Sequence, residues 1–113
     1  MILISSPYSH PDVTVKIKRV ERLAKYIDAE IKKGNFVFSP VLYGLTVLKY
    51  VDGKDDWPTW KAFCENAILS SKELWVLKFD GWDKSAGVSG EILFATLNKI
   101  PIKYIDIEDD EKI

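Results

Sequence analysis

Residues 74–105, LWVLKFDGWDKSAGVSGEILFATLNKIPIKYI, decide the fold of this chain. They open with an unbroken apolar run at 74–77, which is typical of a strand that is buried on both faces. A polar, glycine-containing segment follows at 80–90, then a helical stretch at 91–98 and a further strand at 100–105. Two strands joined through a helix predict a parallel pair with a crossover connection.

The same alternation continues toward the N-terminus. A short strand is predicted at 2–5, and Asp12 offers a cap for a long helix that Gly34 ends. The apolar residues of this helix recur at steps of mostly three and four, and they are Val15, Val20, Leu23, Ala24, Ile27 and Ile31. A second strand at 36–38 stops at Ser39-Pro40, because proline cannot donate to a strand ladder.

The region between that strand and residue 74 carries weaker signals. Residues 41–51 are apolar and partly helical in period, and 52–56 form a polar turn. Trp57-Pro58 opens a helix that runs to about residue 71, since proline is favoured at the first turn. The acidic tail at 106–112 is expected to fray.

Strands that alternate with helices predict one α/β domain over residues 1–113, with a parallel sheet covered by helices on both faces. Such sheets bind ligands beyond the carboxyl ends of their strands. The segments at those ends are 5–8, 39–40 and 80–90, and we expect them to converge on one crevice.

Composition excludes several classes of protein. The formal net charge is −1, so a long nucleic acid is not the expected partner. Cys64 is the only cysteine, which fits a reducing compartment, and one histidine with one cysteine cannot build a structural zinc site. The chain lacks a signal-peptide pattern and any apolar run of about 20 residues. We therefore expect a cytoplasmic protein that binds no membrane.

The segment 83–91, DKSAGVSGE, is the strongest candidate for a binding site. Gly87 and Gly90 would let the backbone turn tightly and approach a ligand, and the first turn of the following helix would offer N–H groups to an anion. The Ser85 hydroxyl could add a donor. The pattern is neither a P-loop nor a dinucleotide fingerprint. The alternative is a glycine-rich turn before a capped helix.

Several other side chains near this crevice have two interpretations each. Glu91, in or near the first helical turn, could complement the helix dipole or act as a nucleophile. Tyr8 could end a strand or orient a carboxylate, and His10 is a weak candidate for acid–base chemistry. Glu65 could be a solvated charge or could protonate a leaving base. Loop tryptophans could pack in the core or stack on a base.

A larger set of residues resembles the DUF1937 family, a group of small, often phage-encoded proteins. The resemblance covers nearly the whole chain, and its pieces are SSPYSHP at 5–11, FSP at 38–40, ELWVL at 73–77, DGW at 80–82 and SxGVxxE at 85–91. These pieces are also similar to nucleoside 2-deoxyribosyltransferases and deoxynucleoside 5′-monophosphate N-glycosidases. The resemblance implies a Rossmann-like, flavodoxin-like α/β/α domain with four to five parallel strands.

The same resemblance implies roles for particular residues. Glu91 matches a glutamate that attacks C1′ of deoxyribose, Tyr8 falls near a tyrosine that orients it, and Glu65 stands where the family usually has an aspartate. Ser85 matches a serine that binds the 5′-phosphate. The remaining substrate-binding candidates are Gly87, Ser5, Ser6, Pro7, Asp80, Trp82 and Ser39. The resemblance implies no metal and no organic cofactor, and a homodimer or higher oligomer.

Three hypotheses remain open from the sequence. The first is an enzyme that cleaves or transfers the N-glycosidic bond of 2′-deoxynucleoside 5′-monophosphates or deoxynucleosides. The second is a non-catalytic module that binds a nucleotide in the same crevice, which the glutamate at position 65 favours. The third is a structural or interaction protein without a nucleotide ligand.

Overall fold

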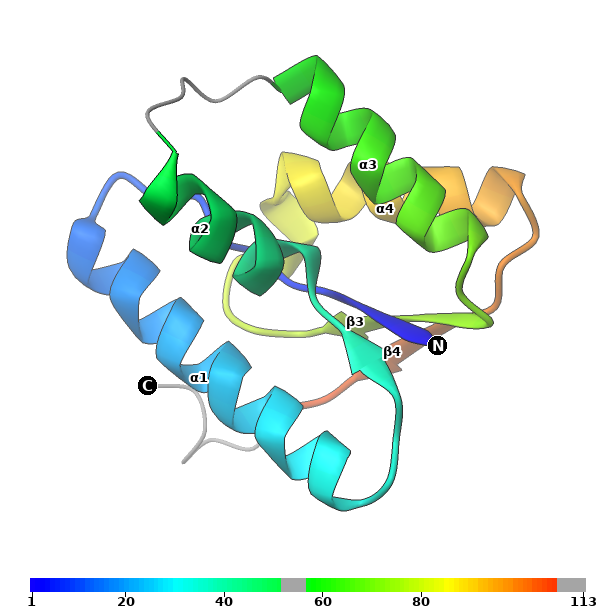
Figure 1. Ribbon diagram of the computed structural model, residues 1–113, viewed down its shortest axis with the longest axis horizontal. Helices are drawn as coiled ribbons and strands as arrows, with labels where there is room; N and C mark the ends of the chain where they lie inside the picture. The colour runs from blue at the N-terminus through cyan, green and yellow to red at the C-terminus, as the bar shows by residue number, and fades with distance from the viewer. Residues whose placement is uncertain (52–56, 108–113) are drawn as a thin grey trace.

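The computed structural model describes residues 1–51 and 57–107, and it has an α/β fold (Figure 1). In chain order the elements are β1 (Ile2–Ser5), α1 (Val13–Lys32), β2 (Val37–Phe38), α2 (Pro40–Tyr50), α3 (Trp57–Leu69), β3 (Glu73–Leu77), the short 3₁₀ helix η1 (Trp82–Lys84), α4 (Ala86–Leu97) and β4 (Ile102–Ile105). The four strands form one all-parallel sheet in the order β2-β1-β3-β4.

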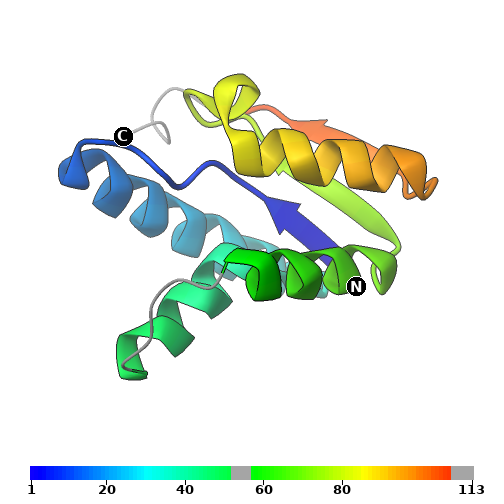
Figure 2. The same cartoon turned by 90° about the horizontal axis from the view of Figure 1, so that it is seen from above.

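The helices cover both faces of the sheet, which is consistent with a three-layer Rossmann-like fold (Figure 2). Ile2 and Ile4 of β1 pack with Leu23 of α1 on one face, while Leu3 packs with Ile68 of α3 and Val88 of α4 on the other. Neighbouring strand residues point to opposite faces, so one apolar strand supplies both cores.

The strand order reverses between β1 and β3. The chain leaves β1 toward β2 through α1 and leaves β3 toward β4 through α4. The connections from neighbouring strands therefore run in opposite directions at the carboxyl ends of β1 and β3. An open parallel sheet leaves a crevice for a ligand at such a point.

Local sequence signals explain where the helices begin and end. Asp12 caps α1 by accepting a hydrogen bond from the Thr14 N–H, and Ser39 caps α2 by accepting from the Leu42 N–H. Gly34 has a φ of 90° just after α1, a conformation that glycine adopts without steric cost. The expected cap at Asp12 and the expected stop at Gly34 are both confirmed.

Most predicted elements are confirmed, and three predictions need correction. The partly helical period at 41–51 corresponds to helix α2, so two helices rather than the one expected join β2 to β3. Helix α4 begins at Ala86 rather than at residue 91. Ala24 and Ile31, predicted to lie on the apolar face of α1, are exposed. The turn at 52–56 and the tail from 108 lie outside the described residues.

None of the helices in the described ranges is both long enough and apolar enough to cross a membrane.

Candidate functional site

Glu91 and Ser5 meet at the carboxyl end of the sheet. Ser5 is the last residue of β1 and is 1% exposed, and its Oγ donates a hydrogen bond of 2.9 Å to Oε1 of Glu91 on α4. The two residues are 86 positions apart in sequence. The end of β1 and the second turn of α4 therefore meet at this edge of the sheet.

The Glu91 carboxyl group is poised to titrate near neutral pH. Burial raises its pKa from 4.5 to about 7, and the hydrogen bond from Ser5 lowers it in part. In the described part of the chain, no lysine or arginine forms a salt bridge with this carboxylate. A partly buried carboxyl group with a raised pKa and no salt-bridge partner among the described residues is a frequent feature of active sites.

The position of Glu91 on α4 rules out one of its two interpretations. Because α4 begins at Ala86, Glu91 lies in the second turn, beyond the N-terminal turn where a carboxylate gains most from the helix dipole. Ser85 holds the N-cap position instead, since its Oγ accepts a hydrogen bond of 3.2 Å from the Val88 N–H. The helix dipole therefore does not account for a carboxylate at position 91.

The Ser85 hydroxyl can donate one hydrogen bond to a ligand. Its hydroxyl oxygen is used as an acceptor by Val88, which leaves the O–H proton as a donor. The first N–H groups of any α-helix have no partner within the helix, and in α4 they belong to Ala86 and Gly87. The start of α4 therefore presents donors to an anion.

The glycines of this segment act differently from the prediction. Gly87 and Gly90 lie inside α4 with ordinary helical φ values, so neither makes a tight turn. A Cβ at Gly87 would lie 3.9 Å from Ser85 Oγ, and one at Gly90 would meet nothing within 4 Å. Gly81 is the glycine that the backbone requires, because its φ is 88°.

The remaining candidates after β1 occupy different environments. Ser6 is buried, and its Oγ has no hydrogen-bond partner within the described residues. Pro7 is also buried. Tyr8 is half-buried with the Lys16 ammonium 5.6 Å from its ring centre, whereas the hydroxyl that holds Glu91 belongs to Ser5. The hydrogen bond to Glu91 that the structure contains is thus made by Ser5, and the role expected of Tyr8 stays a prediction.

Helix α3 places the Cys64 thiol within reach of the charge of Glu91. The pKa of Cys64 is raised to about 11, first by burial and then by the negative charges of Glu91 and Glu65. Cys64 is half-buried, as a small residue between packed helices would be. Glu65 accepts a hydrogen bond of 2.9 Å from the Lys61 ammonium one turn earlier.

The three remaining predicted residues have structural partners. Ser39 caps α2. The backbone carbonyl of Asp80 accepts a hydrogen bond from Arg19 Nη2, and its side chain is exposed. Trp82 is half-buried. The centres of its ring and the Tyr104 ring are 5.6 Å apart, and the two ring planes are tilted by 55°. Trp82 therefore packs against the edge of the sheet, and Asp80 contributes to the pocket described next.

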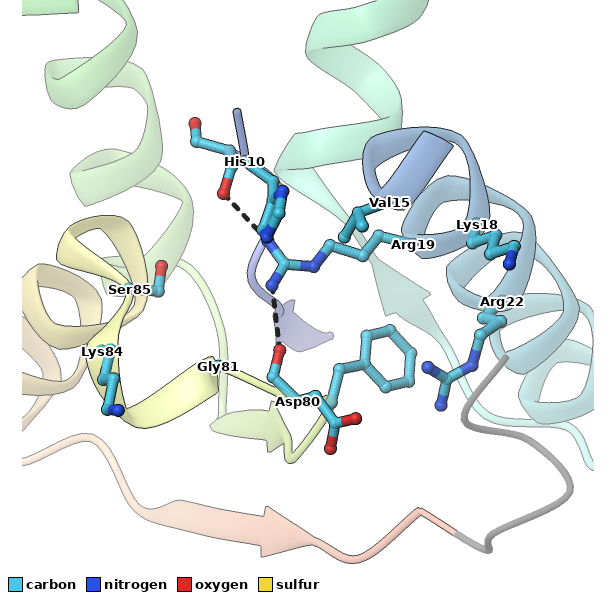
Figure 3. Close-up of a pocket in the computed structure, with 11 residues that line it drawn as sticks. His10, Val15, Lys18, Arg19, Arg22, Asp80, Gly81, Lys84 and Ser85 are labelled. Atoms are coloured by element: carbon cyan, nitrogen blue, oxygen red, sulfur yellow. Dashed lines mark hydrogen bonds between the residues drawn. The ribbon is translucent and has the colours of Figure 1, made fainter. Parts of the chain in front are cut away.

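A pocket of about 580 Å³ opens between α1 and the segment from β3 to α4 (Figure 3). Its lining includes Ser85, so it continues directly from the start of α4. Its ionisable lining consists of Lys18, Arg19, Arg22, Lys84, Asp80 and His10. Among the described residues that line it, Lys18, Arg19 and Lys84 outnumber the Asp80 carboxylate, and this charge balance favours an anion.

Arg19 joins the two walls of that pocket. Its Nη1 donates to the Ser9 carbonyl over 2.9 Å and its Nη2 donates to the Asp80 carbonyl over 2.9 Å (Figure 3). Sequence reasoning missed this residue because the predicted period of α1 rests on its apolar residues alone. The available signal was helical spacing, since Arg19 and Arg22 share a side of α1 with Val15.

Comparison with known proteins gives one family. The family described as Domain of unknown function (DUF1937) matches residues 1–106, which is nearly the whole chain. No curated protein matches this sequence significantly.

Proposed function

The chain belongs to the DUF1937 family, and we propose that it is an enzyme acting on the N-glycosidic bond of 2′-deoxynucleoside 5′-monophosphates or deoxynucleosides. It cleaves the bond, or transfers the sugar to a second base, through Glu91 as the nucleophile. The observation that carries the proposal is the half-buried Glu91 carboxyl group with its raised pKa, which accepts a hydrogen bond from Ser5 and lies on the helix whose first N–H groups are open to an anion. The resemblance to nucleoside 2-deoxyribosyltransferases and monophosphate N-glycosidases supplies the reaction class.

In the proposed reaction Glu91 attacks C1′ of the deoxyribose. The bond from C1′ to the base breaks through an oxocarbenium-like state, and a glycosyl ester forms with the carboxylate. A carboxylate that is poorly solvated is well suited to stabilising positive charge that develops on the sugar. Water then hydrolyses the ester, or a second free base attacks C1′ and is released as a new nucleoside.

The start of α4 binds the 5′-phosphate in this proposal. The Ser85 O–H and the N–H groups of the first helical turn donate to the phosphate oxygens. Ser85 precedes Glu91 by six residues, so one helix carries both the phosphate site and the nucleophile. Binding of the phosphate would then place C1′ relative to the carboxylate.

The leaving base accepts a proton as it departs, and Glu65 is the proposed source. The carboxylate of Glu65 lies on α3 opposite α4, near enough to Cys64 to affect its pKa. To donate, Glu65 first has to take up a proton from solvent and give up its ion pair with Lys61. A second candidate function is a non-catalytic module that binds nucleotides. Two features of Glu65 favour it: the ion pair with Lys61, and a side chain longer than the aspartate that is usual at this position.

Self-association would complete this site in the proposal. Leu93 and Leu97 on the outer side of α4 are 59% and 71% exposed, and Tyr104 of β4 is 48% exposed. Apolar side chains gathered on a helix that carries the nucleophile are suited to contact a second copy of the chain.

The enzyme would act on the cytoplasmic nucleotide pool, within the host cell if it is phage-encoded.

The test is chromatography of free base released from each deoxynucleoside 5′-monophosphate and each deoxynucleoside, with and without a second base as acceptor. The Glu91→Gln protein is the control, because it keeps the shape of the side chain and removes the nucleophile. Base release by the wild type alone supports the enzyme. Nucleotide binding by both proteins with release by neither supports the binding module instead.

A further inference from the structure

The cations of the pocket are spread along its length rather than gathered at one point. Lys84 lies beside Ser85 on one side, Lys18 and Arg22 lie on the opposite side, and Arg19 lies between them (Figure 3). A single phosphate bound at Ser85 would lie at one end of this row (Figure 3). The distribution fits an extended anion.

Two of these cations are held in place by the fold. Arg19 donates to carbonyls on both walls, at Ser9 and Asp80. The Arg22 guanidinium lies 4.3 Å from the ring centre of Phe79, a residue that is 2% exposed. Because stacked and bridged guanidinium groups lose little further freedom when an anion binds, these positions are pre-organised for a ligand.

We propose that this pocket binds a chain of two or three phosphate groups, so that deoxynucleoside di- and triphosphates bind at the proposed site more tightly than the monophosphates. The inference deepens the proposed function and rests on it for the position of the sugar. The phosphate next to the sugar is bound at Ser85, and the following phosphates extend past Arg19 toward Lys18 and Arg22. Glu91 does not line the pocket and faces Ser5 instead. The polyphosphate therefore leads away from the reacting bond.

The positive charge of this pocket is local, because the chain as a whole carries no net positive charge. Formal net charge is −1, and the exposed Asp80 carboxylate at the pocket opposes any anion. Among the described residues that line the opening, Lys18, Arg19 and Lys84 outweigh that carboxylate. The negative net charge disfavours a long nucleic acid, and the basic pocket favours an anion. A short chain of phosphates on a nucleotide agrees with both observations.

The first experiment uses inorganic probes, because they do not require knowledge of the base. Titration calorimetry in buffer without divalent cations compares phosphate, pyrophosphate and tripolyphosphate. We expect tripolyphosphate to bind several-fold to roughly tenfold more tightly than phosphate, as additional ion pairs form. Lys18→Gln should weaken tripolyphosphate binding roughly threefold and leave phosphate binding unchanged.

The control variant is Lys72→Gln, which makes the same change in net charge at the amino end of β3, away from the pocket. It should alter neither affinity. Equal affinity for the three probes would overturn the proposal, and so would equal effects of the Lys18 and Lys72 substitutions. Circular dichroism and thermal unfolding of each variant verify that both proteins are folded.

The second experiment identifies the nucleotide as the source of the phosphates. The Glu91→Gln protein, which cannot turn over substrate in the proposed reaction, is titrated with the mono-, di- and triphosphate of each deoxynucleoside. Tighter binding with each added phosphate is expected, and triphosphates that bind no more tightly than monophosphates would contradict the proposal. If this series holds while the wild type releases no base, the proposed reaction fails but the pocket assignment stands.

Discussion

The Ser5 hydroxyl donates to the Glu91 carboxylate over 2.9 Å and joins the end of β1 to the second turn of α4. It is the one hydrogen bond from a side chain that Glu91 receives within the described residues. Ser5 is 1% exposed, so this hydroxyl has no ready access to water as a substitute partner. The contact fixes the direction in which the carboxylate points.

Ser5→Ala should reduce base release by roughly ten- to 150-fold with little change in KM, because a hydrogen bond to a charged group contributes about 1.5–3 kcal/mol. Loss of that bond also removes the interaction that lowers the Glu91 pKa, so the acid limb of the pH–rate profile should move to higher pH. Ser71→Ala is the matched control, since Ser71 is a buried serine that bonds to the Ile68 carbonyl. An unchanged acid limb in Ser5→Ala would contradict the positioning role.

The raised pKa of Glu91 makes stability depend on pH. The folded protein holds this proton up to a pH of about 7, whereas the unfolded chain releases it near 4.5. The protonated group contributes its full stability below pH 4.5, and this contribution is lost as pH rises to about 7, by at most about 3 kcal/mol.

Glu91→Gln should therefore unfold at nearly the same temperature as the wild type at pH 4.5 and at a higher temperature at pH 8. Calorimetric unfolding of both proteins across this range measures the difference. A gap that does not widen with pH would mean that the carboxyl group is not buried as described.

The reactivity of the Cys64 thiol depends on the charge of Glu91. Burial and the nearby charges raise its pKa to about 11, so alkylation by iodoacetamide at pH 8 should be slow. Glu91→Gln removes the larger of the two charge effects and should accelerate alkylation more than Glu65→Gln does. Mass spectrometry of the modified protein follows the rate, and equal rates in the three proteins would contradict the placement of α3 against α4.

Two glycine substitutions should have opposite effects on stability. Gly81→Ala places a Cβ at a φ of 88° and 3.0 Å from Arg19 Nη2, so it should cost about 1–2 kcal/mol and disturb the bridge across the pocket. Gly90→Ala meets nothing within 4 Å inside α4 and should stabilise the protein by about 0.5–1 kcal/mol. Urea unfolding measures both. Destabilisation by Gly90→Ala would contradict the open space at that position.

Much of the fold could be predicted from local patterns. The apolar runs in β1 and β3, the cap at Asp12 and the stop at Gly34 depend on neighbouring residues alone. The start of α4 could not be placed in this way. Glycines at positions 87 and 90 lower helix propensity and suggested a loop, but the Ser85 cap and the burial of Val88 outweigh them.

The candidate site could be predicted in part for a similar reason. Strand alternation and topology brought the segments with Ser5, Ser85 and Glu91 to one edge of the sheet. Which hydroxyl faces Glu91 depends on the direction of one side chain at the end of β1, and that direction is set by tertiary packing. The bridge formed by Arg19 depends on carbonyls from two distant loops, so no sequence pattern encodes it.

The most direct test of the account is the rate of base release by the wild type and the Glu91→Gln protein between pH 5 and 9, with the nucleotide that the substrate panel selects. The account predicts release by the wild type alone, at a rate that rises as pH passes about 7 and Glu91 becomes ionised. Release by the Gln variant at the wild-type rate, or no release by the wild type from any phosphorylated or free deoxynucleoside, would contradict it.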